Sequence, residues 1–378
     1  MVPFDIQLPT RTVFGRGKAQ QTLEGLLGTY KNPLIVHGAD PQRVSWLLEL
    51  FDGYRSISCA GEPDIIALEA ALQVARGGEL APVIAIGGGS VIDLGKAIAG
   101  LAATKKPLLN YLEVVGEGKP IDAEPLPFIA IATTSGTGAE ATKNAVIGVP
   151  EHGRKVSIRD ARMLADLAIV DPALTEGCPR SITLASGLDA ITQLIEPYVS
   201  SRANAFTDAI IRQALEPALV AIRQLANGED PDARDAMAYA SYMSGIALSH
   251  AGLGAVHGLA GVVGGITGAA HGEICAALLV PALVINREKL KEQGQSTERL
   301  DEIEALLARH FAGYRGSTGF ERLSSWVRNV GMRGPSDLGL DGENTRQIAT
   351  LAQNSSSMKA NPADLSIQDL SRILSLEG

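Results

Sequence analysis

Residues 83–103 read VIAIGGGSVIDLGKAIAGLAA, an apolar run that leads through a glycine turn into a helical pattern. A strand that passes through glycines into a helix N-terminus exposes backbone N–H groups and the positive end of the helix dipole, an arrangement that binds phosphate. The stretch therefore predicts one strand–helix unit of an α/β domain, with a nucleotide site at Gly87–Ser90. The alternative is that these glycines serve only a tight turn.

Two common phosphate-binding motifs fail in this stretch. A Walker A loop has four residues between its glycine and the Gly-Lys pair, whereas Gly89 and Gly95-Lys96 enclose five. A Rossmann GxGxxG that started at Gly87 would need a glycine where Ile92 stands. The pattern disfavours an ATPase and a standard Rossmann enzyme. A second turn, Thr133–Gly138 (TTSGTG), also follows an apolar run, and two such turns favour a dinucleotide over a single phosphate.

The elements around these turns divide the chain into two parts. Apolar or β-rich runs predict strands at 33–36, 54–58, 83–86 and 128–132, with helical patterns between several of them. Helical patterns alone follow at 183–199, 203–226, 231–250, 273–287, 297–312, 320–330 and 344–352. We expect an α/β N-terminal dinucleotide-binding domain over residues 1–173, built on a parallel sheet, and an all-α C-terminal domain over residues 174–378.

Two histidines in the helical part, His257 and His271, are candidates for a metal site. On one unbroken helix their 14-residue separation would span roughly 21 Å, too far for two imidazoles on one ion. Three glycines in the gap, Gly264, Gly265 and Gly268, provide a place for the chain to end one helix and turn back. The alternative is a pair of ordinary helical histidines beside a glycine-rich packing seam.

A carboxylate upstream strengthens the metal interpretation. Asp189 lies in SITLASGLDAITQLIEPYVSS among apolar residues, where an acid is costly unless it is paired or binds a cation. One carboxylate and two imidazoles suit Zn²⁺ or Fe²⁺ and leave positions for water or substrate.

Composition excludes several classes of function. The net charge of −9 disfavours nucleic acid and an anionic membrane surface as partners, so a small molecule is expected. The three cysteines are widely spaced and match neither a disulfide framework nor a CxxC metal site. The N-terminal segment lacks an apolar signal region, and no run approaches a membrane span. We expect a cytoplasmic protein.

Several motifs in order resemble the iron-containing (group III) alcohol dehydrogenases, in the superfamily that includes glycerol dehydrogenase and dehydroquinate synthase. The resemblance covers almost the whole chain. It runs through VFGRG (13–17), GGGSxxDxxK (87–96), TTSGTGAE (133–140), VDP (170–172), ASGLDAITQLIEPYVS (185–200) and the two-histidine segment. It implies a dinucleotide-binding domain, a helical domain, a divalent metal and a homodimer.

The resemblance also implies roles for individual residues. The pyrophosphate and nicotinamide loop corresponds to Gly88, Gly89, Ser90 and Asp93. Adenosine and phosphate contacts correspond to Thr133, Thr134 and Thr137, and further nucleotide contacts to Asn144 and Lys155. Asp189, His257 and His271 correspond to metal ligands, through which they would act in catalysis.

This chain departs from the family at two positions near the metal. Gln193 stands where the family has a histidine one helical turn after the aspartate, and a neutral amide oxygen is a weaker ligand than imidazole. Gln193 is therefore only an alternative fourth ligand. Gly261 stands where another active-site histidine is frequent, and His250 is a candidate to replace it as a proton relay.

The choice of cofactor depends on the residues after the first nucleotide strand. NAD-preferring proteins carry an acid there to hold the ribose 2′-OH, whereas this chain has Gly38, with Arg43 nearby and Asp40 as an opposing charge. We expect NADP(H) in preference to NAD(H).

Together these features predict an NAD(P)-dependent, metal-assisted alcohol dehydrogenase or aldehyde reductase for a small substrate, using Fe²⁺ or Zn²⁺. One alternative is a metal-independent oxo-acid reductase of the maleylacetate type or a hydroxyacid transhydrogenase. A lyase like dehydroquinate synthase needs clustered cations for its phosphorylated substrate, but residues 189–271 contain no lysine. A remaining alternative is a nucleotide-binding protein without catalysis.

Overall fold

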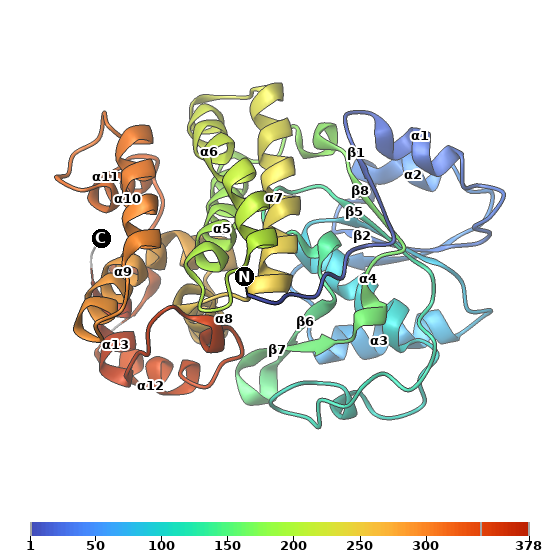
Figure 1. Cartoon of the computed structure of the whole chain (residues 1–378). Coiled ribbons are helices and arrows are strands. Elements are labelled where there is room, and N and C mark those ends of the chain that lie inside the picture. Colours follow the sequence, from blue (N-terminus) through green and yellow to red (C-terminus); the bar gives the residue numbers. More distant parts are fainter. Residues whose placement is uncertain (1, 341, 377–378) are drawn as a thin grey trace. The chain divides into compact units, whose positions relative to one another are not determined.

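The computed structural model describes residues 2–340 and 342–376, and the chain divides into two compact units. The first unit is Ile6–Gly177, and the second begins at Cys178 and also includes the N-terminal segment through Asp5. In Figure 1 the first unit carries the blue to green colours, and the second carries the yellow-green to red colours apart from its blue N-terminal segment.

The first unit is a six-stranded, fully parallel sheet in the order β1-β8-β5-β4-β2-β3. Its strands are β1 (Arg11–Phe14), β2 (Leu34–Gly38), β3 (Arg55–Cys59), β4 (Val83–Gly87), β5 (Phe128–Ala132) and β8 (Leu167–Val170). Its helices are α1 (Lys18–Glu24), α2 (Ser45–Leu48), α3 (Ile65–Arg76) and α4 (Gly89–Leu101). An antiparallel hairpin, β6 (Asn144–Val149) and β7 (Arg154–Arg159), lies outside the main sheet.

The strand and helix at 83–101 form the centre of this unit. All five residues of β4 are buried, as expected for a strand that is covered on both faces. Helix α4 packs closely on β4 because Gly95 has no side chain, and a Cβ there would lie 2.6 Å from the Cβ of Ala85. This close contact fixes the N-terminus of α4 at the carboxyl end of the strand.

The second unit is helical throughout its described elements. These are α5 (Arg180–Val199), α6 (Ala205–Asn227), α7 (Pro231–Ala251), α8 (Ala255–Thr267), α9 (His271–Glu292), α10 (Glu298–His310), α11 (Gly319–Asn329), α12 (Gly342–Ala352) and α13 (Ile367–Ser375). One large apolar cluster joins them, with Leu188, Ile195 and Leu278 among its fully buried members. Helix α5, buried over most of its length, contributes many of these side chains.

The predicted fold class, a parallel α/β part followed by a helical part, is confirmed. The prediction missed four short strands, β1, β6, β7 and β8, and the helices α1, α2 and α13. It expected a helix to end between His257 and His271 but gave no range for α8. Helix α9 begins at His271 rather than at Glu273, a difference that changes the interpretation of the site.

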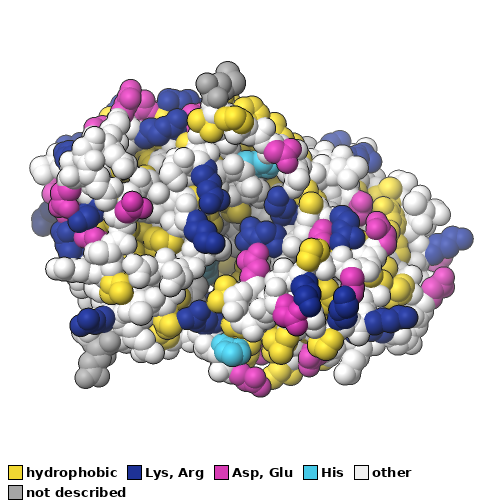
Figure 2. Space-filling model, turned by 60° about the horizontal axis from the view of Figure 1, so that its bottom comes forward, with side chains coloured by type: hydrophobic (Ala, Val, Ile, Leu, Met, Phe, Trp, Pro, Cys, Tyr) yellow, Lys and Arg dark blue, Asp and Glu magenta, His cyan; other side chains and the backbone are white. Residues whose placement is uncertain are grey.

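The distribution of surface charge and the hydropathy of the helices are relevant to the expected small-molecule partner. Figure 2 shows basic, acidic and apolar side chains intermixed over the face that it draws. Among the described residues no single helix has the length and apolar character to cross a membrane, although α7 and α8, bent by 105°, pass that test as a pair.

Candidate metal centre and nucleotide turns

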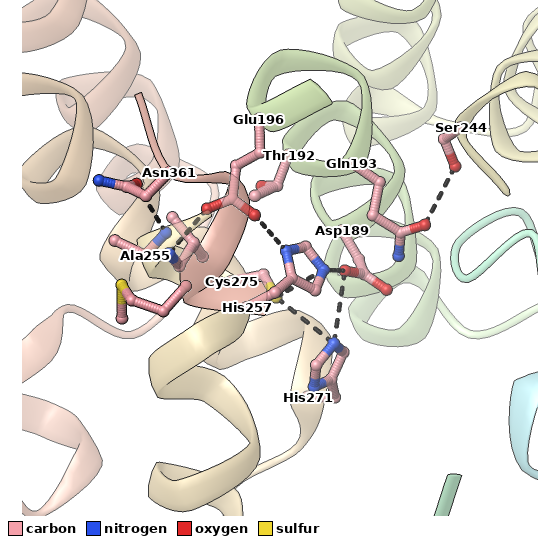
Figure 3. A network of polar contacts seen from close by, with 12 residues as sticks. Asp189, Thr192, Gln193, Glu196, Ser244, Ala255, His257, His271, Cys275 and Asn361 are labelled. Atoms are coloured by element: carbon pink, nitrogen blue, oxygen red, sulfur yellow. Dashed lines mark hydrogen bonds and ion pairs between the residues drawn. The ribbon is translucent and has the colours of Figure 1, made fainter. Parts of the chain in front are cut away.

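Four side chains from three helices converge in the second unit (Figure 3). Asp189 comes from α5, His257 from α8, and His271 and Cys275 from α9. Their potential ligand atoms all lie within 4.8 Å of one another. The structure therefore brings together the three residues that the sequence predicted as metal ligands, and adds a cysteine that the sequence analysis did not select.

A helix break places the two histidines side by side, as their spacing predicted. Helix α8 ends at Thr267 and is capped by Gly268, whose φ of 69° is the left-handed conformation that glycine adopts readily. His271 then begins α9, and the two imidazole ring centroids lie 5.3 Å apart.

A close contact between helices holds this pair against Asp189. A Cβ at Gly272 would collide with the backbone oxygen of Ala185 on α5. Because only glycine permits this approach, the N-terminus of α9 contacts α5 one turn before Asp189.

The carboxylate of Asp189 is the centre of the group. Its Oδ1 lies 3.1 Å from Nε2 of His257 and 3.7 Å from Nε2 of His271. Its side chain is 3% exposed and that of His257 is 6% exposed, whereas that of His271 is 31% exposed. Water or a small ligand can thus reach the group from the His271 side.

Glu196, two turns after Asp189 on α5, fixes the orientation of His257. Its Oε2 accepts a hydrogen bond of 2.6 Å from Nδ1 of His257, and its Oε1 accepts one of 2.7 Å from the backbone N–H of Val256. With one proton held on Nδ1, Nε2 is the ring nitrogen that faces Asp189, and it can bind a metal when it gives up its own proton. A carboxylate behind a ligating histidine is a common feature of metal sites.

Electrostatics in the cluster favour positive charge. Burial would raise the pKa of Asp189, but His271 and His257 outweigh it and lower the pKa to about 2. Burial would lower the pKa of both histidines, but Cys275 and Asp189 outweigh it. They raise the pKa of His271 to about 9 and, together with Glu196, raise that of His257 well above its usual value. A divalent cation would balance the same negative charge in place of the protons on the two histidines.

Gln193 and His250 have other contacts in this structure. Oε1 of Gln193 accepts a hydrogen bond of 3.2 Å from Oγ of Ser244, and the amide forms a hydrogen bond that lowers the pKa of Asp189. Nδ1 of His250 lies 2.7 Å from the carbonyl oxygen of Ile246, and its ring packs edge-on against Phe206. Ligation by Gln193 and a relay at His250 stay predictions.

In the first unit, the predicted nucleotide residues gather at the carboxyl ends of three neighbouring strands. Gly38 ends β2, Gly88 is the N-cap of α4 after β4, and Thr133 follows β5. A parallel α/β sheet binds ligands at this edge. The turns after β4 and β5 are joined by a 2.9 Å hydrogen bond from the N–H of Thr133 to the carbonyl oxygen of Gly87.

The two turns also fit each other sterically. A Cβ at Gly88 would lie 3.2 Å from Oγ1 of Thr134, and one at Gly89 would lie 2.6 Å from Oγ1 of Thr137. Glycine is therefore needed where α4 starts. Val91 N–H bonds to the carbonyl oxygen of Gly88, whereas the N–H groups of Gly89 and Ser90 at the helix start are suited to an anion.

Other predicted nucleotide residues lie around these turns. Ser90 is in the first turn of α4, and Oδ2 of Asp93 accepts a hydrogen bond of 3.1 Å from Val146 N–H. Asn144 is the first residue of β6. Lys155 lies on β7, where it pairs with Gly148, four residues after Asn144 on β6. The ammonium of Lys155 forms an ion pair with Glu62.

Ser135, in the turn after β5, was not selected from the sequence. Its Oγ is buried and has no hydrogen-bond partner within the described residues. A buried hydroxyl of this kind is suited to a bound polar ligand.

Both sites suit the groups that the sequence predicted. A carboxylate oxygen and two imidazole nitrogens are the donor set that Fe²⁺ and Zn²⁺ accept in proteins. The paired turns, with a helix N-terminus at one of them, suit a pyrophosphate.

Comparison with known proteins gives consistent matches over most of the chain. Residues 9–172 match the family model "Iron-containing alcohol dehydrogenase", and residues 183–377 match "Fe-containing alcohol dehydrogenase family, C-terminal". The NAD-dependent methanol dehydrogenase of Bacillus methanolicus is 35% identical over 298 residues, covering 77% of this chain and 76% of that protein. Alcohol dehydrogenase 4 of Saccharomyces cerevisiae (strain ATCC 204508 / S288c) is 33% identical over 361 residues, covering 92% and 90%.

Solved structures agree with these matches. A 1,3-propanediol oxidoreductase superposes with a TM-score of 0.82 at 28% identity, covering 99% of each chain. An alcohol dehydrogenase from Oenococcus oeni superposes with a TM-score of 0.83 at 26% identity, again over 99% of each chain.

Proposed function

Because this chain belongs to the iron-containing alcohol dehydrogenase family, and is an oxidoreductase acting on CH–OH groups, we propose a specific reaction for it. The protein transfers hydride between C4 of a nicotinamide dinucleotide and a small alcohol or aldehyde, assisted by a divalent metal. Asp189, His257 and His271 hold that metal.

The convergence of Asp189, His257 and His271 is the observation that carries this proposal. Their three potential ligand atoms come from separate helices, and two of the three side chains are almost fully buried. Burying an ionised carboxylate costs free energy that the packing of two imidazoles and a thiol around it does not recover. A cation at this point compensates the buried charge.

The chain's own residues position the reactants. When bound, the metal supplies Lewis-acid polarisation of the substrate oxygen and the nucleotide supplies the hydride acceptor or donor. Glu196 holds a proton of His257 on Nδ1, and so leaves Nε2 as the ring nitrogen that binds the metal. Gly88 and Gly89 allow the start of α4 to receive the pyrophosphate.

Gly261 lies one helical turn after His257 on α8, so both residues are on the same face of that helix. A Cβ at Gly261 would meet no atom within 4 Å. The site therefore has room at the position where the resemblance leads us to expect a histidine. His250 remains the candidate for moving the hydroxyl proton, and the homodimer and the cytoplasmic location likewise remain predictions.

For the dinucleotide we propose NADP(H). Gly38 offers no carboxylate to a ribose 2′-OH, and the exposed Arg43 is a nearby cation. The Asp40 carboxylate accepts a hydrogen bond from Gln42 N–H and caps the 3₁₀ turn Pro41–Val44. A clear preference for NADH in kcat/KM would reject this choice. Gly38→Asp, at a position where a Cβ meets nothing within 4 Å, should shift the preference toward NADH.

A calorimetric titration of chelator-stripped protein tests the metal. Fe²⁺ and then Zn²⁺ are added without oxygen and with NADPH present, and an aldehyde panel follows under the metal that binds. We expect one equivalent to bind and to restore turnover. Turnover of an oxo acid by the stripped protein would instead identify a metal-independent reductase, and no turnover in the loaded protein would identify a binding protein without catalysis.

A further inference from the structure

Cys275 lies one helical turn after His271 on α9, so both side chains occupy the same face of that helix. The cysteine is completely buried. Its Sγ lies 3.7 Å from Nε2 of His271 and 3.8 Å from Nε2 of His257. The sulfur is therefore directed toward the same nitrogen atoms that face Asp189 (Figure 3).

The nitrogen–oxygen and sulfur–nitrogen separations are close to the edges of a coordination tetrahedron, and all four donor atoms lie within 4.8 Å of one another. Metal–nitrogen and metal–oxygen bonds of about 2.0–2.2 Å place N and O about 3.4 Å apart, and a metal–sulfur bond of about 2.3 Å places S and N about 3.6 Å apart. The corresponding distances here are 3.1 and 3.7 Å for nitrogen to oxygen. For sulfur to nitrogen they are 3.8 and 3.7 Å.

Gln193 is less suited to this position than Cys275. Its amide oxygen is used by Ser244, which leaves the amide NH₂ to face Asp189. An NH₂ group donates a hydrogen bond and does not bind a cation. The side chain thus supports the Asp189 carboxylate from outside the cluster.

We propose that Cys275 is the fourth protein ligand of the metal, which completes an Asp–His–His–Cys donor set. This inference rests on the proposed function, because it assumes the metal held by Asp189, His257 and His271. On binding, a sulfur–metal bond forms, the S–H bond breaks and the proton leaves to solvent.

The thiolate has a consequence for metal selection and for substrate entry. Thiolate ligands favour Zn²⁺ and Co²⁺ over Fe²⁺ more strongly than oxygen or nitrogen ligands do. With Asp189, His257, His271 and Cys275 all bound, a substrate oxygen would need a further coordination position or the place of one of these ligands.

Cobalt spectroscopy on the full chain tests the assignment. Stripped protein is titrated with Co²⁺ without oxygen, and we expect one equivalent to give both d–d bands and a thiolate-to-cobalt charge-transfer band. Cys275→Ser should keep the d–d bands and lose the charge-transfer band. Its affinity for Zn²⁺ should fall by about 10-fold or more, and its affinity for Fe²⁺ by less.

The other cysteines provide the controls. The chain has three cysteines, so the double variant Cys59→Ser/Cys178→Ser leaves Cys275 as the only thiol and should retain the band. This variant also decides the question if Cys275→Ser does not fold. Cobalt binding without a charge-transfer band would overturn ligation by Cys275 and leave the proposed metal site intact. Failure to bind cobalt would overturn both.

Discussion

The Oε2 atom of Glu196 lies 2.6 Å from Nδ1 of His257, on the side of the imidazole ring that faces away from Asp189. Both side chains are 6% exposed, so this hydrogen bond is shielded from competition by water. The same carboxylate accepts the N–H of Val256 at the start of α8. Glu196 therefore orients both the histidine and the helix that carries it.

Glu196→Gln should weaken metal binding by about 10–100-fold, the usual effect of removing a carboxylate behind a ligating histidine. Competition with a coloured chelator measures this affinity. Glu216→Gln, which changes a carboxylate paired with His310 away from the site, is the matched control. Equal metal affinities in the two variants would reject a positioning role for Glu196.

His271→Ala should remove metal retention while nucleotide binding continues, because the nucleotide turns belong to the other unit. Losing a direct ligand should cost more than about 100-fold in metal affinity, beyond the effect of an outer residue. Metal content after gel filtration and an NADPH fluorescence titration measure the two properties. His310→Ala is the control, and unchanged metal content in His271→Ala would exclude His271 from the site.

Gly89→Ala should weaken NADPH binding by at least about 10-fold, equivalent to about 1.4 kcal/mol, because the new Cβ would lie 2.6 Å from Oγ1 of Thr137. Metal affinity should not change. Gly28→Ala, in the same unit, is the control because its Cβ meets nothing within 4 Å. Normal NADPH binding by Gly89→Ala would show that these turns do not hold the nucleotide.

The stability of the first unit should fall as pH rises from about 4.5 to about 7. Burial raises the pKa of Glu140 from 4.5 to about 7, against the opposing charge of Lys96. In this window the folded state holds a proton that the unfolded state has lost, so stability falls by up to about 1.4 kcal/mol for each pH unit. The loss is complete above the folded pKa.

Glu140→Gln should remove most of this slope, since glutamine does not ionise. The chain has two tryptophans, and Trp326→Phe leaves Trp46 as the fluorescent reporter of the first unit. Urea unfolding at pH 5 and pH 7.5 in that background gives the comparison. Identical slopes with and without the Glu140→Gln substitution would contradict the assignment.

Sequence periodicity predicted the fold well where apolar runs are long or bounded by glycine. Val83–Ile86 and the following helix pattern correspond to β4 and α4. Strand β1 was missed because its four residues are mostly exposed and carry no apolar alternation. The hairpin β6–β7 was missed because its pairing depends on residues that contact each other across the turn.

The site was predicted only in part for a related reason. Asp189, His257 and His271 were selected from burial cost and spacing, and the structure brings their donor atoms together. Cys275 was overlooked because the helix was expected to begin at Glu273, which left His271 outside it. With the helix beginning at His271, the spacing of four residues is a readable signal. Glu196 had the same kind of signal, an acid within a buried helix face.

The metal centre joins residues that lie far apart in the sequence, on either side of the helix break at Gly268. A cation bound by Asp189 and His257 is a cross-link that closes a loop of 68 residues, and the same ion joins the two helices that meet at Gly268. In polymer terms, each closure removes freedom from the unfolded chain, and the longer loop loses more of it. The ion would therefore stabilise the packing of α5, α8 and α9 in addition to its role in catalysis. Its release would destabilise these three helices together.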